Sequence, residues 1–112
     1  MTRNEALAEV REMRPNEYQD ELLLKWLDEL EERIYRELLD GYIVPEMGED
    51  LIAPDPYSGM YRWWLVANID LATGEMDRYN NYLSLFNSLW DEYGRMISRR
   101  YRREKPARYR RI

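Results

Sequence analysis

The sequence predicts an all-α protein. Three observations support this class: only five Gly and five Pro occur in 112 residues, apolar residues recur three or four positions apart, and Gly or Pro falls where each periodic segment stops. A chain of this length forms one domain. We expect an antiparallel bundle of three main helices plus a short N-terminal helix, a long loop between helices 2 and 3, and an extended basic C-terminal tail.

The first helix is predicted over residues 3–13, where Ala6, Val10 and Met13 share one face. Pro15 ends it, because the residue before a proline avoids the helical region. A second helix is predicted over 21–39, with Asp20 as its N-cap and Gly41 after its end. Its apolar stripe consists of Leu23, Leu27, Leu30, Ile34 and Leu38.

A long connection follows over residues 41–54, which contain two Gly and two Pro and lack helical periodicity. Its "YIV" and "LIA" segments are long enough to pair as a small hairpin. Their apolar character indicates that the loop is covered, either by its own body or by a neighbouring subunit. The candidate subunit-interface residues are Tyr42, Ile43, Val44, Leu51 and Ile52.

The third helix is predicted from Pro56 to about Thr73, with Asp55 as N-cap. It is apolar nearly all round and should be central. Gly74 ends it, and a last helix is predicted from Glu75 to about Arg103. Its heptad ladder, typical of shallow-angle packing, consists of Met76, Tyr79, Leu83, Phe86, Trp90, Tyr93 and Ile97.

Polar residues near the last turn form a candidate structural cluster. Asn is a poor residue inside a helix, so the Asn residues of the last helix need a reason. Simple exposure is one reason. The other, which we favour, is that they hydrogen-bond buried charged groups at the turn. This predicted cluster consists of Asp70, Arg78, Asn80, Asn81 and Asn87.

The sequence offers little for catalysis. It lacks Cys and His, which excludes thiol nucleophiles, disulfides and the commonest general base and metal ligand. The acidic side chains Asp28, Glu29, Glu31 and Glu32 are interpreted as a solvated helix face rather than a metal site. We therefore expect neither an enzyme nor a cofactor. The most apolar stretch, "WWLVANIDLA", is too short to span a membrane, so no membrane association is expected.

Charge is distributed unevenly along the chain. Residues 1–94 hold 21 acidic and 8 basic residues, net −13, whereas residues 95–112 hold 1 acidic and 9 basic residues, net +8. We therefore divide the chain into a helical domain, 1–98, and a basic tail, 99–112, which is the candidate partner-binding segment. The partner-binding residues are Arg99, Arg100, Arg102, Arg103, Lys105, Arg108, Tyr109, Arg110, Arg111 and Ile112. Charge alone leaves open whether they meet nucleic-acid phosphates or an acidic protein surface.

Several strings occur in a specific order: "RPN", "KWLDELEERIYRE", "PDPYSGMYRWWLVANID", "GEMDRYNNYLSLFN" and an Arg-rich end. Over residues 14–103 this order resembles the small head–tail connector (adaptor) proteins of tailed phages and of prophages of Gram-positive bacteria. The resemblance implies a structural virion protein, assembled in the host bacterial cytoplasm and located at the head–tail interface. The alternative is a small helical nucleic-acid-binding regulator that uses the basic tail.

The resemblance also implies partners. Proteins of this type form a homo-oligomeric ring, typically twelvefold, beneath the portal protein, with a tail-side connector or stopper protein below and DNA passing through the lumen. The C-terminal segment would reach the portal, and the loop over 42–52 would touch the next subunit or the tail side. A ring needs a heterologous contact between two different faces of each subunit. The acidic face of the second helix and the Arg-rich segment are complementary in charge.

Overall fold

A computed structural model describes residues 1–104. Four helices lie in this range: α1 (Arg3–Met13), α2 (Asp20–Glu37), α3 (Gly59–Thr73) and α4 (Met76–Arg100). Residues 1–104 contain two isolated bridges but no strand. The prediction of an all-α fold is therefore confirmed.

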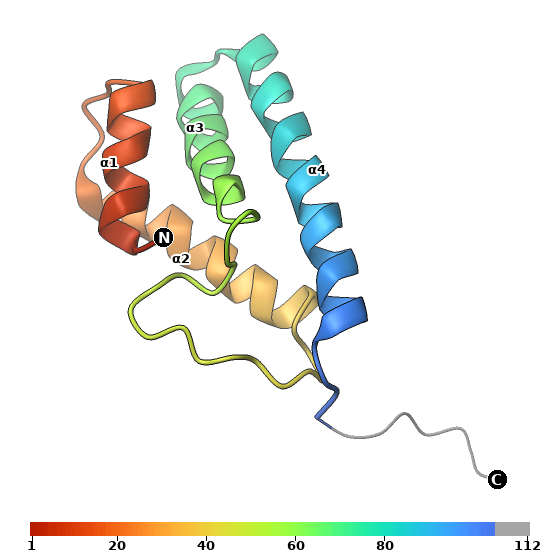
Figure 1. The fold of residues 1–112 in the computed structure, drawn as a ribbon. Coiled ribbons are helices and arrows are strands. Elements are labelled where there is room, and N and C mark those ends of the chain that lie inside the picture. Colours follow the sequence, from red (N-terminus) through yellow and green to blue (C-terminus); the bar gives the residue numbers. More distant parts are fainter. Residues whose placement is uncertain (105–112) are drawn as a thin grey trace, which may run out of the picture.

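Helices α1, α3 and α4 stand side by side, and α2 runs obliquely across them (Figure 1). The most extensive pairing joins α3 to α4, which are antiparallel neighbours. Both α1 and α2 also pack on α3. This position of α3 agrees with its predicted central place and with its nearly uniform apolar character.

Local chemistry explains the ends of the helices. At the start of α1, Thr2 and Glu5 form a capping box: the Glu5 N–H donates to Thr2 Oγ1 at 3.1 Å, and the Thr2 N–H donates to Glu5 Oε1 at 2.8 Å. These hydrogen bonds lower the pKa of Glu5. At the end of α3, Gly74 adopts the left-handed conformation with φ of 82°, so the predicted break there is confirmed.

The predicted start of α3 is wrong by three residues. The helix begins at Gly59, because residues 55–58 form a separate turn in which the N–H groups of Tyr57 and Ser58 both donate to the carbonyl of Pro54. The Ser58 hydroxyl donates to Asp55, which therefore stabilises this turn instead of capping the helix. Helix α4 ends at Arg100 rather than near Arg103, since the chain then turns toward the loop after α2.

The core collects buried side chains from all four helices and from the end of the long loop. Tyr61, Phe86 and Tyr93 are its largest fully buried members. The rings of Trp64 and Trp90 lie 5.2 and 5.7 Å from the Phe86 ring, which they partly shield from solvent. Burying one such large side chain stabilises the fold by roughly 1.5–3 kcal/mol.

Candidate docking surface at the end of α4

The basic C-terminal segment begins on a fixed part of the molecule. After α4, the Ile43 N–H donates to the carbonyl of Arg102 at 2.7 Å, and the Glu104 N–H donates to the carbonyl of Gly41 at 2.8 Å. These two bonds hold residues 101–104 along the base of the loop that follows α2 (Figure 1). The folded body therefore extends beyond the predicted boundary at residue 98 and includes residues 99–104.

Aromatic contacts strengthen this attachment. The Arg103 guanidinium carbon lies 4.9 Å from the centre of the Tyr42 ring, a cation–π contact between the two paired segments. Tyr101 is half-buried against the core, and burial raises the pKa of its hydroxyl. Gly41, with φ of 82°, adopts the left-handed turn that brings the loop to this position.

The end of α4 carries exposed positive charge. All of Arg95, Arg99, Arg100, Arg102 and Arg103 are exposed. Within residues 1–104, the ion pairs involve the N-terminal amine and other Arg residues, so none of these five is neutralised by a described carboxylate. The other predicted partner-binding residues, Lys105, Arg108, Tyr109, Arg110, Arg111 and Ile112, lie outside the described residues.

Two hollows flank these arginines. A groove of about 520 Å³ lies along α4 beside Leu38, the residue after α2, and its lining includes Leu38, Trp90 and Gly94. A smaller hollow of about 240 Å³ lies beside Ile43 and Arg102. Positive charge, apolar surface and a concave shape therefore occur together at this end of the molecule, a combination typical of protein-binding sites.

The predicted subunit-interface residues separate into two groups. Leu51 and Ile52 are only 4% and 6% exposed and belong to the chain's own core, so a neighbouring subunit cannot cover them. Ile43 is 50% exposed, and Tyr42 and Val44 are half-buried. The hairpin prediction is also wrong. The "YIV" segment pairs with residues 102–104, and the Leu51 N–H donates to the carbonyl of Met1 at 2.7 Å.

A buried polar network holds the second half of this loop. The Tyr61 hydroxyl donates to Glu31 Oε1 at 2.5 Å and accepts from the Ala53 N–H at 2.9 Å, while the Ile52 N–H donates to Glu31 Oε2 at 3.0 Å. Burial raises the pKa of Glu31, although the hydrogen bonds from Tyr61 and Ile52 partly oppose this shift. Burial also raises the pKa of Tyr61 and of Tyr93, whose hydroxyl donates to the Ile52 carbonyl at 3.4 Å.

The interpretation of Glu31 as part of a solvated acidic face is therefore wrong. Its place between Leu30 and Ile34 on the apolar stripe of α2 is a signal that could have revealed this. A carboxylate at such a position needs hydrogen-bond donors, which here come from residues distant in sequence. Asp28 and Glu29 do point to solvent, as expected.

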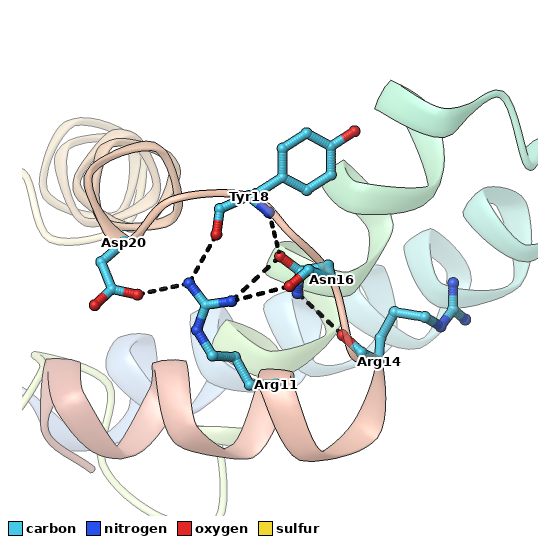
Figure 2. A network of polar contacts seen from close by, with 5 residues as sticks. All are labelled: Arg11, Arg14, Asn16, Tyr18 and Asp20. Atoms are coloured by element: carbon cyan, nitrogen blue, oxygen red, sulfur yellow. Dashed lines mark hydrogen bonds and ion pairs between the residues drawn. The ribbon is translucent and has the colours of Figure 1, made fainter.

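The connector between α1 and α2 is also held by polar contacts, which Figure 2 shows. Arg11 donates to the carbonyl of Tyr18 at 2.8 Å and to Asp20 at 2.6 Å. Asn16 accepts from the Tyr18 N–H at 3.0 Å and donates to the carbonyl of Arg14 at 3.0 Å. These contacts join residues of the turn to one another, so we assign this network a structural role.

The polar cluster predicted at the α3–α4 turn does not form with the predicted partners. Asp70 is fully buried, but its cation is Arg14 from the connector and not Arg78. Burial alone would lower the pKa of Arg14, but the hydrogen bond and charge of Asp70 outweigh it and raise that pKa. Arg78 is exposed and lines an open cavity of about 610 Å³ beside Arg14.

The three asparagines of that cluster, Asn80, Asn81 and Asn87, are all exposed. The apolar stripe of α4 faces the core through Phe86 and Tyr93, so these positions fall on the outer side of the helix. Exposure, the simpler alternative for the Asn residues, is the correct one.

Among the described residues, no group of acidic side chains is arranged to hold a metal ion. None of the helices within residues 1–104 is long and apolar enough to cross a membrane. Comparison of the chain with protein families, with curated proteins and with solved structures finds no match.

Proposed function

We propose that the chain is a structural virion protein, a head–tail connector (adaptor) subunit that forms a homo-oligomeric ring beneath the portal. The proposal combines the resemblance in sequence with the position of the basic segment. It includes the antiparallel-bundle description of the body, a ring that is twelvefold as is typical of such proteins, and a location at the head–tail interface of the virion.

One observation carries this proposal. The backbone bonds from Ile43 to Arg102 and from Glu104 to Gly41 give the basic segment a fixed origin on the body. Exposed arginines cluster around that origin, while the rest of the chain is acidic. Because residues 101–104 are held by these bonds, the arginines among them lose less conformational freedom on binding than unattached ones would.

The partner that fits this surface is a protein with an acidic surface, which we propose is the portal. Complementary charge would speed the encounter and fix the register, and apolar contacts at Ile43 and Tyr101 would supply affinity. The negative charge of the body would repel the phosphates of DNA in the lumen. DNA would therefore pass through the ring without binding to its wall.

The experiment compares two variants with the wild type. One lacks residues 105–112, and the other keeps the length but replaces Lys105, Arg108, Arg110 and Arg111 with Ser. We expect both to fold with unchanged circular dichroism and to lose attachment to portal-filled heads of the phage or prophage that carries the gene. Attachment at the wild-type level by either variant would contradict the proposal.

The second candidate, a nucleic-acid-binding regulator, is favoured by the same exposed arginines. Binding to duplex DNA, measured by fluorescence anisotropy at several salt concentrations, separates the two. Four or five phosphate contacts would give a log–log slope of roughly −4. Such a slope would support the regulator, and failure to bind DNA at low salt would eliminate it.

A further inference from the structure

We infer that the tip of the loop between α2 and α3, residues 45–49, docks into the groove formed by α4 and Leu38, the residue after α2, in a second copy of this chain. The inference deepens the proposed function, on which it rests, because it names the two surfaces that join neighbouring subunits of the ring. It differs from the interface expected from sequence, since the receiving surface is a groove that sequence alone does not reveal.

The chain is anchored to the body on both sides of the loop tip. On one side the Ile43 N–H is bonded to Arg102, and on the other the Leu51 N–H is bonded to Met1. Burial of Leu51 in the core fixes the second half of the loop, where the chain returns to the body. The tip between these anchors is therefore a short segment with both ends fixed, which lowers the entropic cost of docking.

The tip is acidic and exposed. Glu46 and Glu49 both point to solvent, and neither forms an ion pair within residues 1–104. Asp50, the next acid, is already paired with the N-terminal amine at 3.8 Å. The tip therefore presents two carboxylates that lack a described partner.

The groove has complementary properties. Trp90 and Leu38 supply the apolar part of its lining. Arg95 and Arg99 also line it and outnumber the single acid, Asp91. Two guanidinium groups thus face two carboxylates across the proposed contact.

The positions of the two surfaces suit a contact between copies. In Figure 1 the loop bulges from the side of the molecule away from α4, and none of residues 45–49 lines the groove of its own chain. A patch that meets a different patch on the next copy is a heterologous contact, and its repetition builds a ring when the rotation closes.

Cysteine cross-linking tests the contact directly, because the chain has no Cys. Glu49→Cys on one copy and Ser98→Cys on another are mixed under mild oxidation, so a mixed disulfide can form only between chains. We expect a cross-linked pair at least roughly tenfold above that formed with Ser88→Cys, which is exposed elsewhere on α4. A yield no higher than this control overturns the inference, as does a dominant Glu49→Cys homodimer.

Charge exchange provides a second readout. Adding Glu46→Lys to the loop variant should reduce the mixed disulfide roughly tenfold, and adding Arg95→Glu to its partner should restore it. Glu12→Lys, the same charge change on α1, should have no effect. Attachment to heads is measured separately. If cross-linking is lost but attachment is retained, only this inference is contradicted. If cross-linking is retained but attachment is lost, only the proposed binding to the portal is contradicted.

Discussion

The two connections that flank α2 are stabilised in different ways. The connector before it, residues 14–19, is shaped by polar contacts at the surface plus one buried ion pair between Arg14 and Asp70. The loop after it, residues 38–58, is tied down by apolar burial and by the network around Glu31 and Tyr61.

The difference shows where each connection is vulnerable. The connector depends on contacts between residues close in sequence, so most single losses there are small, with Arg14 as the exception. The loop depends on groups from α2, α3 and α4, so a change far from it in sequence can release it. Four predictions, from the largest effect to the smallest, test this contrast.

Replacing Arg14 with Met should have the largest effect on stability. Asp70 would remain fully buried without its cation, and breaking such a pair costs about 3–5 kcal/mol. Urea denaturation measures this loss. Arg11→Met is the matched control, because its partner Asp20 is exposed and the pair should contribute about 1 kcal/mol or less. Equal losses for the two variants would refute the distinction.

Replacing Tyr61 with Phe should release the loop. The change removes the hydroxyl that joins Ala53 to Glu31 and leaves buried groups unpaired, at a cost of about 2–3 kcal/mol. Hydrogen exchange at the Ala53 amide should become faster than in the wild type. Tyr35→Phe, at an exposed position, should change stability by less than about 0.5 kcal/mol. An unchanged exchange rate at Ala53 would show that the network does not hold the loop.

The pH dependence of stability should report on Glu31. Because its folded pKa is raised above 4.5, the folded protein keeps this proton at a pH where the unfolded chain has lost it. The resulting stability is complete below about pH 4.5 and is lost as the pH rises through the raised pKa. The Glu31→Gln variant should lack this component.

Unfolding free energies of the wild type and Glu31→Gln between about pH 4 and pH 8 provide the measurement. The wild type should lose stability relative to the variant as the pH rises. Glu5→Gln supplies a control of opposite sign, since the capping box lowers the pKa of Glu5 and its contribution disappears as the pH falls. Parallel curves for the wild type and Glu31→Gln would contradict the account.

Replacing Asn16 with Ala should have the smallest effect. It removes three side-chain hydrogen bonds in a partly exposed connector, and about 1 kcal/mol is expected because water can replace part of them. Thermal unfolding of the two proteins gives the comparison. A loss as large as that of Tyr61→Phe would mean that the connector and the loop are equally dependent on single residues.

Much of the helical fold could be predicted from the sequence because it depends on local patterns. The apolar period over 21–39 and the positions of Pro15 and Gly74 set three helix ends within two residues. The start of α3 could not be placed, since Pro56 has the same local preference in a turn as at a helix start.

The candidate site was predicted only in part, and the reason is again the range of the contacts. The basic charge of residues 99–104 is plain in the sequence, but its attachment to Gly41 and Ile43 joins segments some sixty residues apart. The partners of Asp70 and Glu31 were missed for the same cause, because Arg14 and Tyr61 come from other elements. Periodicity identifies a buried face but does not identify what packs on it.

The most direct test of the proposed function is electron cryomicroscopy of the particles made by the phage or prophage that carries this gene. The account predicts a closed ring of this protein beneath the portal, with the Arg102 end of each subunit against the portal and each loop tip in the groove of its neighbour. A head–tail interface that lacks this protein, or a ring whose Arg102 ends face away from the portal, would contradict it.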